Sequence, residues 1–362
     1  MRDQGEEGEA RVISLAGRVE FKRGEFGEWE EARARQSLRS GYFVRTTHNA
    51  SAEIMFVDGT LYTVRPDTLF VVSGSRGGAG AGGPGQSIRM QYGLVDLSTS
   101  KRPSRVATPE AEAEVDQDSS ATVAYDEESK AGRFAAYRGQ MVVASASGGT
   151  QNVGTLQQVT QSGGQLSAPQ SIPRAPELLE PDENHEQSEG DAEIRLAWKT
   201  VSGASHYHLQ VARNQLFADN IIEADGRKKT VATLGVRGPG SFLWRVAAVD
   251  GGGHRGPWST VRRFRIASEA SGEAGTGVVD REPPPLALDI PQAYGSIFII
   301  SGVTEPGAVV TVRGEPVTVS ADGSFAKTLQ VYDNGWSVVV VRAKDAYGNE
   351  STRPIRLYVD NI

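Results

Sequence analysis

The chain has 362 residues, a formal net charge of −7 and no cysteine. Its length is too great for a single hydrophobic core and suits two or three domains of about 100–200 residues each. The acidic balance gives no basic face for nucleic acid, and the lack of cysteine excludes disulfides, thiolate catalysis and cysteine-ligated metal sites.

Short alternating segments fill the first part of the chain. Residues 18–22, 52–56 and 59–64 alternate apolar and polar side chains with period two. This alternation is typical of half-buried β-strands, and Asp58-Gly59 between two of the segments predicts a hairpin turn. Residues 30–38 have a weakly helical pattern, so a short helix is expected there.

A glycine-rich tract interrupts the pattern at residues 73–86. It contains G-x-G-x-x-G twice, but a strand pattern follows instead of the helix whose N-terminus would bind a dinucleotide phosphate. No Gly-Lys-Ser/Thr of a P-loop occurs either. The tract is therefore interpreted as a surface loop, because glycine permits many backbone conformations.

Four segments of the first unit, 10–165, carry a recognisable pattern: residues 38–46, 52–60, 66–69 and 138–143. They resemble the FecR domain, whose members show a G-D-x-[IV]-x-T step, an A-x-[IV]-x-F-x-D-G-[ST] hairpin, a P-x-[ST] turn and a late G-x-V-x-V strand. Here Tyr42 replaces the usual acidic residue after Gly41, and the insertion 73–86 lengthens the middle. The resemblance implies a β-rich roll or sandwich.

Residues 166–189 are rich in Pro, Glu and Ser and are predicted to be a linker that leads into the first strand of a second unit, 176–267. The pattern of that unit is carried by residues 196–198, 204–212, 242–250 and 256–259. It is similar to a fibronectin-type-III domain, a β-sandwich about 10 Å thick. The inward positions expected from alternation are Trp198, Tyr207, Leu209, Val211, Phe242, Trp244, Val246 and Ala248.

A second spacer at 268–285, which ends in three prolines, precedes a third unit at 286–360. Its pattern is carried by residues 300–312, 321–325 and 343–349, which are similar to bacterial immunoglobulin-like modules of secreted and surface proteins. Pro306-Gly307 and Asp322-Gly323 predict tight turns. The fold class is therefore predicted to be all-β: a FecR-like β-rich roll or sandwich followed by two β-sandwiches, fibronectin type III-like and Ig-like.

The histidines and carboxylates show no clear chemical site. His206 and His208 share one face of a strand, but that face is expected to be solvated, Arg245 would repel a cation, and no third ligand is evident. Four acidic residues between strands lack the D-x-D-x-D-G spacing of a calcium loop, and no acid–base pair or G-x-S-x-G nucleophile can be assigned. The sequence therefore predicts no catalytic residue, no metal site, no cofactor and no enzyme activity.

Aromatic residues are the remaining candidates for contact with a partner or a glycan. Trp198, Trp244 and Trp258 are assigned to the core of the second unit. Trp29, Trp336 and Tyr347 are the candidates for an exposed ring that stacks on a sugar or on a protein partner. Packing at the core or its rim is the alternative that stays open for them.

Modules of this kind, without catalytic chemistry, favour a structural or interaction protein of the bacterial cell envelope. Its expected partners are other envelope proteins, with peptidoglycan or polysaccharide as further options. The FecR resemblance implies an alternative, periplasmic signalling to a sigma factor, although the cytoplasmic segment and membrane span of such regulators are missing. The Ig-like resemblance implies a third option, a peptidoglycan- or carbohydrate-binding accessory module.

No run approaches the roughly 18–20 apolar residues of a membrane span, and the first seven residues lack the apolar core of a signal peptide. Taken literally, this start indicates the cytosol. The family resemblances favour the periplasm or cell surface instead, with a signal or lipid anchor removed ahead of the first residue.

Overall fold

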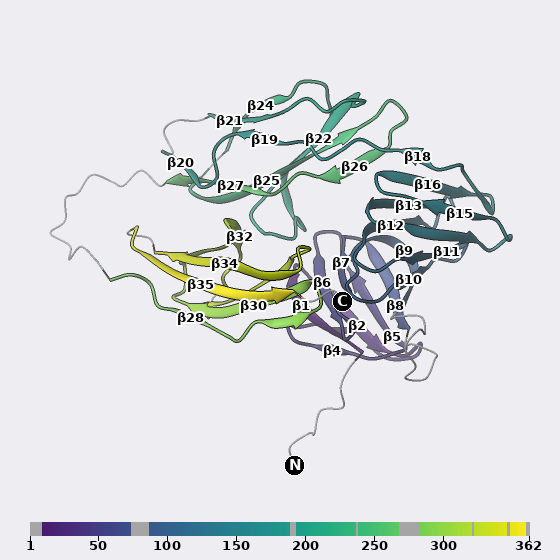
Figure 1. Ribbon diagram of the computed structural model, residues 1–362, viewed down its shortest axis with the longest axis horizontal. Coiled ribbons are helices and arrows are strands. Elements are labelled where there is room, and N and C mark those ends of the chain that lie inside the picture. The colour runs from purple at the N-terminus through teal and green to yellow at the C-terminus, as the bar shows by residue number, and fades with distance from the viewer. Residues whose placement is uncertain are drawn as a thin grey trace, which may run out of the picture. The chain divides into compact units, whose positions relative to one another are not determined.

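The computed structural model describes residues 9–73, 87–188, 193–236, 238–267, 282–320, 322–345 and 348–359. Within these ranges all secondary-structure elements are β-strands, which confirms the predicted all-β class (Figure 1). Tyr347 and all but the first residue of the glycine-rich tract 73–86 lie outside the described residues, as does most of the spacer 268–285.

The chain divides into two compact units. The first runs through Ile172 and includes Tyr294–Ile297, and the second comprises Pro173–Ala293 and Phe298–Asp360. The described part of the chain contains no helix of the length and apolarity needed to cross a membrane.

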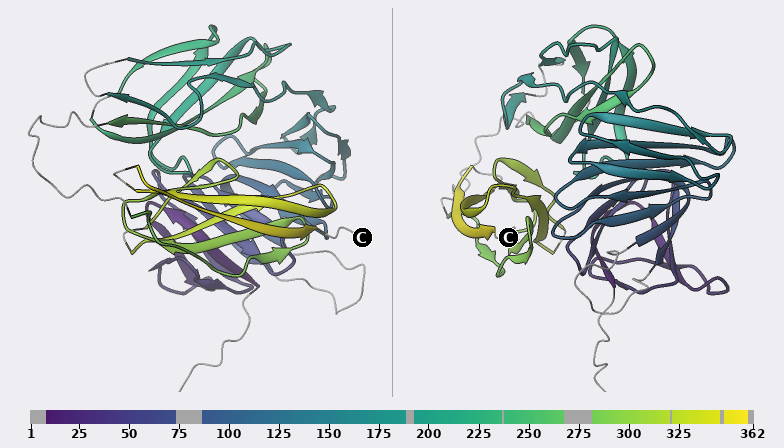
Figure 2. Two further views of the ribbon diagram at one scale, coloured as in Figure 1. Left: turned by 60° about the vertical axis from the view of Figure 1, so that its left-hand side comes forward. Right: turned by 45° about the vertical axis from the view of Figure 1, so that its right-hand side comes forward.

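The first unit consists of two sheets that share strand β9 (Ser87–Ser98), and Figure 2 shows its strands, coloured purple to teal, running side by side. In one sheet the order is β4–β1–β6–β7–β9–β12–β13–β16, with β17 and β18 pairing with β16. These strands are β1 (Ala10–Ala16), β4 (Ser37–Leu38), β6 (Ser51–Phe56), β7 (Leu61–Val64), β12 (Ser120–Asp126), β13 (Ala131–Arg138), β16 (Gln157–Ser162), β17 (Gln165–Leu166) and β18 (Gln170–Ser171).

The other sheet has the order β3–β2–β5–β8–β9–β10–β11–β14–β15, in which only β9 and β10 run parallel. Its remaining strands are β2 (Val19–Arg23), β3 (Glu30–Glu31), β5 (Tyr42–Thr46), β8 (Thr68–Ser73), β10 (Ser104–Ala107), β11 (Ala111–Val115), β14 (Met141–Ser145) and β15 (Thr150–Val153). The inward side chains of both sheets form one hydrophobic core that runs from Ala10 to Val159. Two half-buried sheets are thus stabilised by a shared apolar interior.

Strand β9 changes sheets at Gly93. Residues before it pair with β8, and residues after it pair with β7 and β12. Gly93 has φ = 106°, and a Cβ there would lie 2.5 Å from the Cα of Thr68. The Thr68 hydroxyl accepts a hydrogen bond from Leu94 N (3.0 Å) and donates one to Leu94 O (3.2 Å). Only glycine fits this backbone conformation and close approach.

Two local predictions for this unit have opposite outcomes. The hairpin at Asp58-Gly59 is confirmed, with Gly59 at φ = 86° between β6 and β7. The helix expected at residues 30–38 is wrong, because the segment contains the short strands β3 and β4, and Arg35 between them has φ = 68°. Ala32 and Leu38 are buried in the core, so tertiary packing overrides the helix propensity of the segment.

The second unit begins with a sandwich of two sheets. One has the order β19–β21–β24, and the other β20–β27–β25–β22–β23, with β26 pairing with β25. The strands are β19 (Leu178–Glu180), β20 (His185–Ser188), β21 (Glu193–Trp198), β22 (His206–Ala212), β23 (Asn220–Arg227), β24 (Val231–Gly235), β25 (Gly240–Val249), β26 (Arg255–Trp258) and β27 (Arg262–Ala267). Its core contains every inward position predicted for residues 198–248, which confirms the alternation.

A further sandwich follows in the same unit. One sheet has the order β28–β30–β29, with β33 pairing with β30, and the other β32–β31–β34–β35. The strands are β28 (Leu286–Leu288), β29 (Gln292–Tyr294), β30 (Ile297–Thr304), β31 (Val309–Val312), β32 (Glu315–Val317), β33 (Ser324–Gln330), β34 (Gly335–Lys344) and β35 (Glu350–Val359). The predicted turn at Pro306-Gly307 is present, with Gly307 at φ = 88°.

Each of the predicted ranges 10–165, 176–267 and 286–360 encloses a separate hydrophobic core. The exact boundaries of these domains stay a prediction.

Candidate functional site

The outer face of the sheet β32–β31–β34–β35 carries two exposed aromatic rings. Trp336 on β34 is 73% exposed and lies opposite Tyr358 on β35, which is 54% exposed. Their ring centroids are 5.1 Å apart and their planes are inclined by 57°. Val338, two residues along β34, is 61% exposed. These three side chains form an open amphipathic surface, here called the aromatic face.

The strand alternation explains why these rings point outward. On β34 the side chains of Val339, Val341 and Ala343 fill the core, and on β35 those of Leu357 and Val359 do so. Successive side chains of a strand point to opposite faces, so the residues between them must face away from the core. β34 and β35 pair over their full length and form the long yellow hairpin of Figure 1. The two rings therefore lie on a regular, fully hydrogen-bonded pair of strands.

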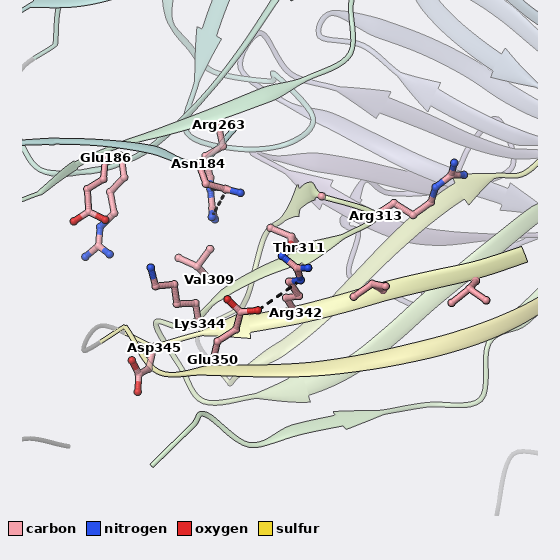
Figure 3. Close-up of a pocket in the computed structure, with 14 residues that line it drawn as sticks. Asn184, Glu186, Arg263, Val309, Thr311, Arg313, Arg342, Lys344, Asp345 and Glu350 are labelled. Carbon is pink, nitrogen blue, oxygen red and sulfur yellow. Dashed lines mark hydrogen bonds and ion pairs between the residues drawn. The ribbon is translucent and has the colours of Figure 1, made fainter. Parts of the chain in front are cut away.

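The same sheet face becomes charged toward the other end of the hairpin. Arg356 lies opposite Val338, and Lys344 lies opposite Glu350. Arg342 Nε is 3.6 Å from Glu350 Oε1, an exposed ion pair (Figure 3). The face therefore offers ring surfaces at one end and charged hydrogen-bonding groups at the other.

A cavity of about 510 Å³ in the second unit includes this charged end. Its lining contains five basic residues, Arg263, Arg265, Arg313, Arg342 and Lys344, and three acidic residues, Glu186, Asp345 and Glu350 (Figure 3). Arg263 donates two hydrogen bonds to Asn184 Oδ1, at 2.9 and 2.6 Å. The excess of donors suits hydroxyl and carboxylate oxygens of a ligand.

Trp29 belongs to the first unit and is half-buried. The guanidinium of Arg45 lies 4.1 Å from its ring centroid, and Nζ of Lys22 lies 5.3 Å from it. The Trp29 ring is therefore already engaged in cation–π contacts with two side chains of the same chain. Of the two aromatic candidates among the described residues, Trp29 and Trp336, it is Trp336 whose ring is openly exposed.

Tyr358 was missed as a candidate in the sequence. It lies between Leu357 and Val359, both buried, so its outward direction follows from the alternation of the last strand. Its position beside Trp336 depends on the β34–β35 register, which the sequence pattern does not state.

The structure corrects the assignment of Trp258 to the core. Trp258 is half-buried outside it, with the guanidinium of Arg245 4.3 Å and that of Arg255 4.7 Å from its ring centroid. Arg245 also lies 4.0 Å from the ring of Phe217. Phe217, Arg245, Trp258 and Arg255 thus form a stack of alternating rings and cations on the outer face of the sheet that contains β25 and β26.

His206 and His208 have carboxylate neighbours that the sequence pattern did not show. His208 Nε2 lies 2.9 Å from Glu223 Oε1, and His206 Nε2 lies 3.6 Å from Asp225 Oδ1, both on β23. His208 is partly buried rather than fully solvated, and burial lowers its pKa while Glu223 opposes that change. Among the described residues no group of three or more His, Asp or Glu side chains is arranged to hold a metal ion.

Comparison with known proteins gives one match to a family model. The family "Glucodextranase, domain B" matches residues 303–361, which include the aromatic face. No curated protein matches the chain.

Solved structures are similar only at low identity. A protein proposed to be an anti-sigma factor from Parabacteroides distasonis shares 14% identity over 36% of this chain, with a TM-score of 0.30, and the chain spans 59% of that protein's length. Fibronectin(III)-like modules of Clostridium thermocellum CbhA share 14% identity over 51% of this chain and 94% of theirs, with a TM-score of 0.22. A solved structure from a study of a 1.5-MDa bacterial ice-binding adhesin shares 13% identity over 74% of this chain and 90% of the solved chain, with a TM-score of 0.21.

Matches at these scores say nothing about what this chain binds. What the strands and cores define is a multidomain β protein, with an open aromatic face on its last sheet.

Proposed function

We propose that this chain is a non-enzymatic binding protein of the bacterial cell envelope, and that its aromatic face holds a polysaccharide or glycan strand. The observation that carries the proposal is the exposed pair Trp336 and Tyr358 on a regular sheet. A tryptophan gains much free energy from burial, so a ring left this open is suited to be covered by a partner.

The chemistry of the aromatic face favours a sugar over a purely apolar partner. Sugar rings have apolar C–H faces that stack on aromatic rings and hydroxyl edges that need hydrogen bonds. Trp336 and Tyr358 offer the rings, and Arg356 and Arg342 on the same sheet face offer donors. The family model that matches this region is named after a domain of glucodextranase, a name that denotes action on a glucan.

The other parts of the proposal come from the sequence. The absence of cysteine and of recognisable nucleophile, phosphate-loop and calcium motifs supports a binding protein over an enzyme. The resemblances to FecR, fibronectin-type-III and bacterial Ig-like modules support a place in the periplasm or on the cell surface. Envelope proteins are further partners on the same grounds.

The test compares the full chain with Trp336→Ala and Tyr358→Ala variants. Retention on insoluble peptidoglycan and affinity electrophoresis in gels containing dextran or other soluble glucans measure the binding. Each substitution is expected to weaken binding about tenfold, as for a central aromatic contact. Both side chains lie outside the core, so the melting temperature is expected to stay close to that of the unchanged chain.

The control is Val303→Ala, a change of an exposed side chain on the opposite sheet of the same sandwich. It is expected to leave retention unchanged. Equal retention of all four proteins would reject the aromatic face as the binding site. Turnover of the same polysaccharides by the purified chain would reject the non-enzymatic assignment.

The signalling alternative has one specific feature in its favour, the Asp58-Gly59 hairpin in the segment that resembles FecR. Co-purification of a sigma factor or an outer-membrane receptor with the full chain would favour it over the binding proposal.

A further inference from the structure

The aromatic face continues into a row of basic side chains on the same side of its sheet. The outward positions of β34 and β35, together with the residue that follows β31, carry four exposed cations and one exposed carboxylate, Glu350. The cations are Arg313, Arg342, Lys344 and Arg356. The whole chain has a net charge of −7, so the composition does not reveal this local excess of positive charge.

Strand alternation places these groups along one line. Every second side chain of β34 fills the core, so Trp336, Arg342 and Lys344 all point away from it. Trp336 and Arg342 are six residues apart, which is about 20 Å at the rise of a β-strand. Arg356 lies opposite Val338, between the ring pair and Arg342. Rings and cations therefore follow each other along the hairpin, as an extended polymer would require.

Most of these cations lack a counter-charge. In the part of the chain that the structure describes, no carboxylate lies within 4.0 Å of Arg313, Lys344 or Arg356. Arg342 has one ion pair, to Glu350 at 3.6 Å, and both of its members are exposed. Guanidinium groups present planar pairs of donors that match a carboxylate, so an anionic ligand can be bound without breaking a strong internal pair.

Screening makes the local charge decisive. At physiological ionic strength, exposed charges more than about 8 Å apart are largely screened from each other. A ligand on this sheet face therefore experiences the cations beside it rather than the net charge of the chain. Charge complementarity favours an anion, and the exposed rings of Trp336 and Tyr358 favour a ligand that also has flat apolar surfaces.

We propose, building on the glycan binding proposed above, that the ligand of the aromatic face is an acidic polysaccharide. Its sugar rings stack on Trp336 and Tyr358, and its carboxylates bind Arg356, Arg313 and the cations beyond them. A membrane surface with anionic lipids would need a broad apolar patch to insert. The exposed apolar side chains of this face are confined to one end of a hairpin, which fits a linear chain better.

The test is titration calorimetry of the full chain with oligogalacturonate and with its methyl ester. The ester keeps the sugar rings and hydroxyls but removes every negative charge. Oligogalacturonate is expected to bind at least about tenfold more tightly at low ionic strength, and added salt is expected to weaken only its binding. Equal affinity for the two ligands would overturn the proposal. Polyglutamate and phosphatidylglycerol vesicles carry negative charge without sugar rings, and equally tight binding of either would also overturn it.

A charge-removing variant tests the basic row. Arg313→Gln combined with Arg356→Gln is expected to weaken oligogalacturonate binding about tenfold. Glutamine keeps a hydrogen-bond donor, so the affinity for the methyl ester is expected to stay the same. The control, Lys228→Gln with Lys229→Gln, removes the same charge from an exposed turn of the same unit. An equal loss in the control would show that overall charge, and not this row, is responsible.

A gain of affinity provides an independent check. Glu350→Gln removes the one carboxylate of the row and is expected to tighten oligogalacturonate binding about twofold, without an effect on the ester. Unchanged or weaker binding would count against the proposal.

Trp336→Ala separates this inference from the glycan proposal on which it rests. If it weakens the binding of two ligands that have equal affinity, only the acidic character is rejected. If it changes the binding of neither ligand, the aromatic face itself is rejected as a glycan site.

Discussion

At the scale of single residues, the buried carboxylate of Glu20 has an uncommon environment. Arg18 Nη2 and Arg45 Nε each lie 2.5 Å from one of its oxygens, and the Arg45 guanidinium is stacked on Trp29. Burial raises the pKa of Glu20, but the hydrogen bonds and charges of Arg45 and Arg18 more than offset this and hold it below its usual value. Trp29 thus stabilises an ion pair of the first unit.

Glu20→Gln is expected to lower the free energy of unfolding at pH 7 by about 1–2 kcal/mol, because two partly exposed guanidinium groups lose their counter-charge. The folded-state pKa lies below the unfolded value of about 4.3. The ionised form therefore stabilises the fold above that value, and its contribution disappears as the pH falls through the folded-state pKa. Urea unfolding at pH 7 and pH 3 measures the difference. A gap between the two proteins that is the same at both pH values would contradict this explanation.

At the scale of elements, the crossing strand β9 joins the two sheets of the first unit. Its central residue, Gly93, combines a positive φ with a backbone contact to Thr68. A strand pattern in the sequence predicts β9 but not the point at which it changes partners, since that depends on β7, β8 and β12 together.

Gly93→Ala is expected to destabilise the first unit by about 3 kcal/mol or more, from the strained backbone and the contact with Thr68. Gly24→Ala is the matched control, because Gly24 also has a positive φ (75°) but has open space around it. Its cost is expected to be about 1 kcal/mol. Thermal and urea unfolding measure both variants, and similar losses would show that the close approach to Thr68 is unimportant.

At the scale of the whole molecule, no disulfide cross-links any of the cores, because the chain has no cysteine. All core residues of the first sandwich of the second unit lie between Leu178 and Ile266. A fragment of residues 173–267 is therefore expected to fold by itself and to unfold in one cooperative transition.

Within that fragment, Trp244→Ala is expected to cost about 3–5 kcal/mol, a large share of the roughly 5–15 kcal/mol that stabilises a small domain. Trp244 is completely buried, whereas Trp258 is half-buried outside the core. Trp258→Ala should therefore cost clearly less. Near-UV circular dichroism and thermal unfolding compare the two, and an equal loss of stability would contradict the assignment of Trp244 to the centre of the core.

The sequence by itself determined the all-β class, the turns at Asp58-Gly59 and Pro306-Gly307, and the inward positions around Trp198 and Trp244. These depend on local backbone geometry and on alternation within one strand, and both are written in consecutive residues. The prediction of a helix at residues 30–38 was wrong because packing against distant strands overrides the local helix propensity.

Only the tertiary structure decided which side chains lie together. Trp336 meets Tyr358, and Tyr125, Gly132 and Gln161 lie in one row, through strand registers that join residues far apart in the chain. A shift of one residue in such a register would turn every side chain of a strand to the other face. The register is selected by the total burial in the core, a property of all strands at once, so the sites it creates cannot be read from any one segment.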